Sequence, residues 1–90
     1  MEIKSVSLTL FGRVQHVGFR HFVFTLALEL GVNGFVKNEL GGCVYIEAEG
    51  EANAVDVFVE HCKMGPSRSV ITKFQVNPLP LQYFNGFTIR

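Results

Sequence analysis

The sequence predicts an α+β sandwich, in which an antiparallel sheet carries two helices on one face. Three observations predict this fold class. Several short segments alternate apolar with polar residues, which is the period of a half-buried strand. Two longer segments repeat their apolar residues at helical spacing instead. Glycines mark most of the boundaries between these segments. With 90 residues, we expect one domain that spans residues 1–90.

The first predicted strand covers residues 5–11, where every second side chain is apolar. Gly12 ends it, and residues 12–19 form a loop. A helix then runs from residue 20 or 21 to residue 30, and Gly31 suits the left-handed position that ends a helix. The apolar face of this helix is so wide that we expect it to be covered on much of its circumference.

Residues 34–38 and 43–49 form two strands joined by a glycine-containing turn. The second of them is expected to point Val44, Ile46 and Ala48 inward and Tyr45, Glu47 and Glu49 outward. A second helix covers residues 52–64 and ends at Gly65. Asn53, with Asp56 three residues later, is a candidate N-terminal cap.

Residues 70–76 form a strand with Val70, Phe74 and Val76 on one face. A short terminal strand, residues 87–90, is placed at an edge or beside the fourth strand. The order β-α-β-β-α-β, with this added fifth strand, is the ferredoxin-like plan. In that plan the first and second strands run parallel with the third between them, about 10 Å apart.

Composition excludes several classes of protein. Eight basic residues balance eight acidic ones, so generic nucleic-acid or anionic-membrane binding is not expected. No apolar run approaches the roughly 20 residues of a membrane span, and the N-terminus lacks a signal-peptide layout, which favours a cytoplasmic protein. Cys43 and Cys62 are expected to be thiols. The histidines and cysteines lack metal-ligand spacing, so we expect no metal and no cofactor.

The loop after the first strand is a candidate anion site. In a loop between a strand and a helix, successive backbone N–H groups can converge, and the helix N-terminus adds partial positive charge. Arg20, at the end of the loop, supplies a guanidinium that can hold two oxygens of a phosphoryl group. The alternative is a connecting loop whose arginine pairs with a surface carboxylate.

Asn38 is the second candidate. It lies at the C-terminal end of the second strand, and Arg20 lies just beyond the C-terminal end of the first. Because these strands are parallel in the predicted sheet, the two side chains can meet over one edge with a phosphoryl group and a water between them. On its own, an asparagine after a strand is more often a turn former.

These residues resemble two motifs of the acylphosphatase family. Residues 12–20 resemble Gly-x-Val-Gln-Gly-Val-x-Phe-Arg. The second motif, which starts Gly-(aromatic)-x-(Lys/Arg)-Asn, is matched by Gly34, Phe35, Lys37, Asn38, Gly42, Val44 and Gly50. The resemblance implies metal-free hydrolysis of acyl phosphates by a protein with the ferredoxin-like fold, and we expect a monomer. It implies that Asn38 orients the attacking water, and it places phosphate binding on the Arg20 guanidinium and on the loop amides of Gln15, His16, Val17, Gly18 and Phe19.

One position departs from the family pattern, because His16 stands where the family has glycine. If the backbone there has φ > 0, histidine carries a conformational penalty. In one reading the side chain points to solvent and the phosphate loop survives slightly strained. In the other, His16 crowds the site or adds charge below neutral pH. Of the other histidines, His21 could face the site and His61 is expected to be exposed.

The chemistry suits so small a set of groups. The leaving group is a carboxylate, whose conjugate acid has a pKa of about 4, so it needs no proton from a general acid. Charge stabilisation and a positioned water then suffice. The main rival reading is the acylphosphatase-like N-terminal module of a hydrogenase-maturation carbamoyltransferase, handling carbamoyl phosphate. A ferredoxin-like RNA-binding domain is disfavoured, because it would need exposed aromatics on the central strands and a basic face.

Overall fold

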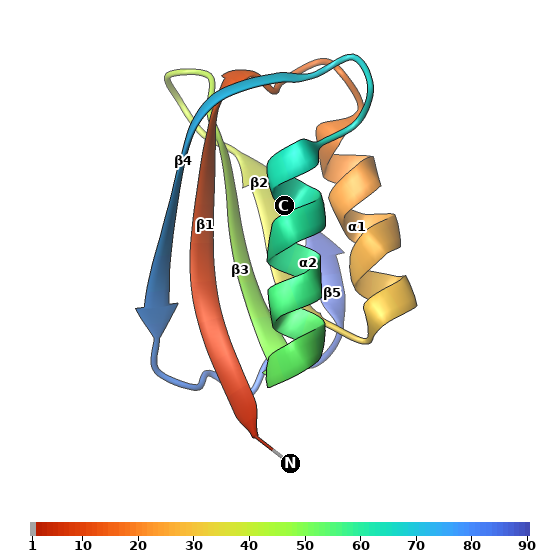
Figure 1. Cartoon of the computed structure of the whole chain (residues 1–90), viewed down its shortest axis with the longest axis vertical. Coiled ribbons are helices and arrows are strands. Elements are labelled where there is room, and N and C mark those ends of the chain that lie inside the picture. The colour runs from red at the N-terminus through yellow and green to blue at the C-terminus, as the bar shows by residue number, and fades with distance from the viewer. Residues whose placement is uncertain (1) are drawn as a thin grey trace.

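The computed structural model describes residues 2–90 and has the element order that the sequence predicts. The elements are β1 (Ile3–Arg13), α1 (Phe19–Leu30), β2 (Asn33–Asn38), β3 (Val44–Glu51), α2 (Ala52–Met64), β4 (Val70–Leu79) and β5 (Phe87–Ile89). The sheet order is β4-β1-β3-β2-β5, and both helices lie on one face of the sheet (Figure 1). The predicted α+β sandwich is therefore confirmed.

The strand pairing agrees with the prediction for the first four strands. β3 is antiparallel to both β1 and β2, so β1 and β2 run parallel with β3 between them. β4 is antiparallel to β1. β5 instead pairs in parallel with β2, at the opposite edge from β4, so the sheet is mixed and not wholly antiparallel. The expected edge position of β5 is confirmed, and the alternative place beside β4 is wrong.

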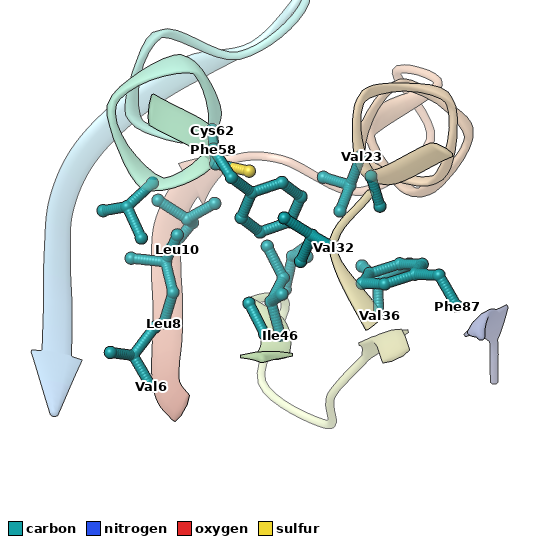
Figure 2. Close-up of a cluster of buried hydrophobic side chains, with 14 of the residues drawn as sticks. Val6, Leu8, Leu10, Val23, Val32, Val36, Ile46, Phe58, Cys62 and Phe87 are labelled. Carbon is teal, nitrogen blue, oxygen red and sulfur yellow. The ribbon is translucent and has the colours of Figure 1, made fainter. Parts of the chain in front are cut away.

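The core lies between the sheet and the two helices (Figure 2). Leu8 of β1 and Ile46 of β3 are fully buried, as the alternation predicts, and Phe58 and Val23 cover them from α2 and α1. Burying a side chain of this size contributes about 1.5–3 kcal/mol. The Phe58 ring also lies 6.0 Å, centroid to centroid, from the ring of Phe87, which joins β5 to the same core.

The helix ends follow the glycines that the sequence marks. Gly31, with a φ of 71°, ends α1, and Gly65 ends α2. The apolar side chains of α1 are buried in the core or packed against it, except for Leu28, which is 61% exposed, so the expected wide cover of this helix is confirmed in part. The buried positions of α1 lie along one side, the side that faces the sheet and α2.

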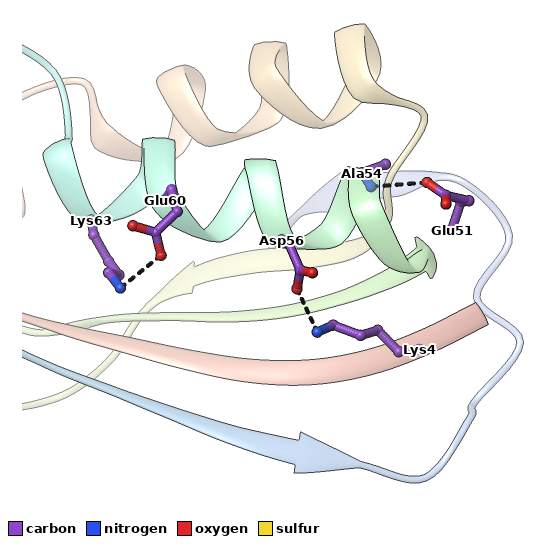
Figure 3. Close-up of polar contacts among 6 residues, drawn as sticks. All are labelled: Lys4, Glu51, Ala54, Asp56, Glu60 and Lys63. Atoms are coloured by element: carbon purple, nitrogen blue, oxygen red, sulfur yellow. Dashed lines mark hydrogen bonds and ion pairs between the residues drawn. The ribbon is translucent and has the colours of Figure 1, made fainter. Parts of the chain in front are cut away.

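Polar contacts hold the start and the exposed side of α2 (Figure 3). The carboxylate of Glu51 accepts a hydrogen bond from the Ala54 N–H at 3.0 Å. The predicted cap at Asn53 is therefore wrong, because the helix has already begun at that residue. Two ion pairs follow along the helix, Lys4–Asp56 and Lys63–Glu60. Exposed pairs of this kind contribute at most about 1 kcal/mol each.

β1 is longer than predicted because it continues through Gly12 to Arg13. Its register against β4 shifts between Phe11 and Gly12, and Gly12 has a φ of 123°. A Cβ atom at Gly12 would lie 2.1 Å from the carbonyl oxygen of Val70. This irregularity therefore requires glycine, and it comes just before the chain enters the loop to α1.

β4 is an edge strand whose apolar side chains are not buried. Phe74 pairs with Leu10 and so lies on the helix side of the sheet, yet it is 47% exposed. β4 lies beyond the edge of α2, so the helix does not cover it (Figure 1). The Lys63 ammonium lies 4.4 Å from the centre of the Phe74 ring, a cation–π contact.

The outer face of the sheet, opposite the helices, holds a buried carboxylate. Glu49 points outward as predicted, but it is only 5% exposed. The backbone N–H groups of Gln82 and Phe84 donate to its two oxygens at 2.6 and 3.0 Å. Segment 80–86 therefore crosses this face between β4 and β5. On the same face, burial and a hydrogen bond donated to Glu47 raise the pKa of Tyr45 to about 12.

Cys43 and Cys62 are free thiols, as predicted. Cys62 is fully buried in the core, and this burial raises the pKa of its thiol. Cys43 is half-buried, just before β3. No helix within residues 2–90 combines the length and the apolar character that a membrane crossing requires.

Candidate active site

The loop between β1 and α1 leaves the helix N-terminus free of side-chain caps. Gly18, the residue before α1, has a φ of 80°, and as a glycine it has no side chain that could cap the helix. The first turn of α1 contains no acidic residue. The first backbone N–H groups of a helix have no partner within the helix, and together with the helix dipole they favour a bound anion.

His16, in the middle of this loop, has a φ of 63°. The left-handed conformation that the family glycine suggests is therefore present, and here a residue with a Cβ atom occupies it. The His16 side chain is exposed, which agrees with the reading that it points to solvent. It also lines the edge of two neighbouring cavities.

The first cavity has a volume of about 260 Å³ and unites the two residues singled out from the sequence. Arg20 enters it from the start of α1, and Asn38 from the end of β2. The lining residues are Val14, His16, Gly18, Phe19, Arg20, His21, Asn38 and Ile89. His21, which by its position at the helix start could face the site, does line the cavity. Ile89 was not expected there, and it reaches the cavity because β5 pairs with β2.

Gln15 and Val17 do not line this first cavity. They line the other of the two cavities that His16 borders, which we call the second cavity. The Gln15 side chain bridges two segments of the chain: its Nε2 donates to the carbonyl oxygens of Glu39 at 2.9 Å and Cys43 at 3.0 Å. These carbonyls belong to the turn that follows Asn38. Gln15 therefore joins the loop that precedes Arg20 to the hairpin that positions Asn38, a role that its place in the motif did not indicate.

Close approach of two strands supports the position of Asn38. Gly34, at the start of the second motif, has a φ of 140°, and a Cβ atom there would lie 1.9 Å from the carbonyl oxygen of Glu47. Only glycine allows β2 and β3 to pair here. Lys37 contacts the Glu39 carboxylate at 3.6 Å and the Tyr45 ring, and it does not line the first cavity.

The charges around the first cavity favour an anionic ligand. Its lining contains a guanidinium and no carboxylate. Within residues 2–90, Arg20 forms no ion pair. The alternative prediction, in which Arg20 pairs with a surface carboxylate, is therefore wrong for the described residues. Glu49 is held by segment 80–86, and His61 is exposed on α2; neither lines the cavity. In the described part of the chain, no three His, Cys, Asp or Glu side chains cluster as a metal site would require.

Comparison with known sequences identifies relatives along nearly the whole chain. The family model for acylphosphatase matches residues 6–89. The acylphosphatase of Thermotoga maritima is 38% identical over 88 residues, which cover 98% of this chain and 98% of that protein. The carbamoyltransferase HypF of Synechocystis sp. is 41% identical over 88 residues, which cover 98% of this chain but only 12% of HypF.

Solved structures give the same result. The crystal structure of acylphosphatase from Bacillus subtilis matches with a TM-score of 0.93 and 38% identity, over 99% of both chains. Full-length HypF in its phosphate- and nucleotide-bound form matches with a TM-score of 0.92 and 38% identity, over 99% of this chain and 12% of HypF. The match of residues 6–89 to the family model, with these identities and this fold, shows that the chain belongs to the acylphosphatase family.

Proposed function

We propose that this chain hydrolyses the carboxyl–phosphate bond of small acyl phosphates, giving a carboxylate and inorganic phosphate. The observation that carries the proposal is the small cavity where Arg20 and Asn38 meet at the uncapped start of α1, with no carboxylate in its lining. The family membership of the chain supports the same activity.

In this mechanism the phosphoryl group binds in the loop. The group lies in the first cavity, where the backbone N–H groups of residues 15–19 and the forked guanidinium of Arg20 donate to its oxygens. Gln15 and Val17 take part through their N–H groups alone, since these two residues otherwise line the second cavity. The same donors stabilise the charge that develops on those oxygens in the transition state, in a site where they are already oriented. The loop therefore contributes binding and electrostatic stabilisation and forms no covalent bond to the substrate.

Asn38 orients the attacking water by hydrogen bonding. The water oxygen forms a new bond to phosphorus, the bond between phosphorus and the carboxyl oxygen breaks, and the carboxylate leaves with that electron pair. The proton released by the water passes to the phosphate itself, since no Asp or Glu lines the cavity. The carboxylate is a weak base, so it leaves without a general acid, and the mechanism we propose requires no metal.

The test is turnover of benzoyl phosphate with and without a chelator and inorganic phosphate. We expect activity that resists the chelator and is inhibited competitively by phosphate. Arg20→Lys keeps the charge but loses the fork, and it should lower kcat/KM by about a hundredfold or more. Arg90→Lys is the matched control, because Arg90 lies over the Phe35 ring and not in the cavity. Near-normal turnover of Arg20→Lys would contradict the role of Arg20.

Asn38→Ala separates water positioning from binding. We expect a strong fall in kcat while the inhibition constant of inorganic phosphate stays within about twofold of its normal value. A loss of phosphate affinity in Asn38→Ala would instead assign Asn38 to binding. Proton transfer to the phosphate is tested separately: it would be refuted by an acidic residue whose substitution abolishes turnover while the protein stays folded.

A second candidate function rests on the similarity to HypF, of which this chain covers 12%. In that reading the same site handles carbamoyl phosphate as one module of a carbamoyltransferase. A comparison of kcat/KM for carbamoyl phosphate and benzoyl phosphate tests it: a strong preference for carbamoyl phosphate favours the module.

We also propose that the protein works as a cytoplasmic monomer without nucleic-acid or membrane partners. The balanced charge supports this, since it provides no generic attraction to polyanions. Light scattering coupled to size-exclusion chromatography gives the mass in solution, and a dimer mass would contradict the monomer.

A further inference from the structure

A second, larger cavity lies beside the phosphate loop. Its volume is about 640 Å³, and it shares His16 with the first cavity. One wall is the loop itself with Arg13 at the end of β1, and the other is formed by residues 67–70, which lead into β4. This second wall is tied locally, because both the backbone N–H and the hydroxyl of Ser69 donate to the carbonyl oxygen of Pro66, at 3.0 and 2.7 Å.

The second cavity is positively charged in a protein of zero net charge. Arg13 and Arg68 line it from opposite walls, and none of its lining residues is acidic. Neither arginine forms an ion pair with any residue from 2 to 90. Two guanidinium groups on one concave surface, without carboxylates, form a site for an anion.

The position of the second cavity relative to Asn38 suits it to receive the leaving acyl group of a substrate. In an in-line displacement the leaving oxygen lies opposite the attacking water. With the water on Asn38, at the end of β2, the leaving carboxylate points away from β2. In the sheet order β4-β1-β3-β2-β5, this direction leads across β3 to β1 and β4, where the second cavity is formed. The acyl part of a substrate would therefore extend into it.

We propose that the second cavity is the acyl subsite, and that Arg13 and Arg68 select acyl phosphates whose acyl group carries a second anionic group, a carboxylate or a phosphate. This inference rests on the proposed function, because it takes the first cavity as the phosphoryl site. It adds two specificity-determining residues that the phosphate loop and Asn38 do not include.

The experiment compares 4-carboxybenzoyl phosphate with 4-methylbenzoyl phosphate. The rigid ring keeps the carboxylate from attacking its own acyl phosphate, and each rate is divided by the uncatalysed rate. The measured quantity is the ratio of kcat/KM for the carboxylate over the methyl substrate. We expect Arg13→Gln and Arg68→Gln each to lower this ratio several-fold, and the double variant to lower it by about tenfold or more. Lys73→Gln is the control, since Lys73 carries the same charge on β4 but does not line the cavity.

A double variant that folds and keeps the wild-type ratio overturns the inference, and so does an equal fall in Lys73→Gln, which would show an effect of net charge only. If the double variant does not fold, the single variants decide. The matching benzylphosphonates, 4-carboxy and 4-methyl, measure binding without turnover. No turnover of either substrate refutes the proposed function, whereas turnover with an unchanged ratio refutes only the acyl subsite. Arginine-dependent binding of the carboxyphosphonate without turnover would leave an anion site and no hydrolase.

Discussion

His16→Gly tests the backbone at the centre of the site. His16 has a φ of 63°, and the left-handed region costs a residue with a Cβ atom about 1–2 kcal/mol. Glycine removes this cost but makes the unfolded chain more flexible, which offsets about 0.4–1 kcal/mol. The net expectation, taken from the midpoints of the two ranges, is a gain of about 0.8 kcal/mol in the free energy of unfolding. For a domain of this size, that gain raises Tm by roughly 3–6 °C.

The assay is urea and thermal unfolding of His16→Gly beside two comparison variants. Tyr83→Gly is the matched control, because Tyr83 has a φ of 56° and is 82% exposed outside both cavities, so it should gain a similar amount. His16→Ala removes the imidazole but keeps the Cβ atom, so it should gain nothing from the backbone. If His16→Gly loses stability while Tyr83→Gly gains it, the imidazole makes stabilising contacts and the reasoning from φ is refuted.

The same variant decides between the two readings of the His16 side chain. Because that side chain is exposed, we expect the phosphate inhibition constants of His16→Gly and the unchanged protein to keep a constant ratio from about pH 5.5 to pH 8. A ratio that changes at the acid end would show that a protonated imidazole contacts the bound anion.

Three further predictions concern the rest of the molecule. Glu49→Gln should lower the free energy of unfolding by about 2–4 kcal/mol in urea, because the two backbone N–H groups of segment 80–86 lose a charged acceptor. In an ultraviolet pH titration, Tyr45 should ionise near pH 12 and not 10. Since the folded pKa of Tyr45 is raised, the stability that its hydroxyl contributes is complete below about pH 10 and is lost as the pH rises towards 12. Tyr45→Phe should abolish this pH-dependent loss, as measured by alkaline unfolding. A thiol reagent should modify Cys43 alone in the native protein and Cys62 only after unfolding; rapid reaction of two thiols would contradict the burial of Cys62.

Sequence patterns predicted most of the fold because they report which side of an element is apolar. The bounds of α2, the left-handed glycine that ends α1 and the parallel arrangement of β1 and β2 follow from such local signals. The same signals also placed Phe74 and Val76 on one face of their strand, which is the helix side of the sheet. They could not show that these side chains are exposed, because exposure depends on how far the helices reach across the sheet.

The errors share this cause. Glu49 has the pattern of an exposed residue, and it is buried only because a segment more than 30 residues later in the chain crosses over it. Likewise, β5 is too short to reveal its partner, and its place beside β2 brings Ile89 to the first cavity. At the site, the motifs located Arg20 and Asn38, but the motif position of Gln15 did not reveal its contacts with Glu39 and Cys43.

The bridge from Gln15 to the β2–β3 turn also bears on refolding. It spans 24 and 28 residues of chain. Arg20 lies at the start of the helix that follows β1 and Asn38 ends β2, and these two strands belong to one sheet only when β3 has paired between them. Contacts of such separation form slowly compared with a local hairpin or helix turn. Regain of enzymatic turnover after dilution from denaturant would thus track completion of the three central strands, whereas circular dichroism would already register helices formed earlier.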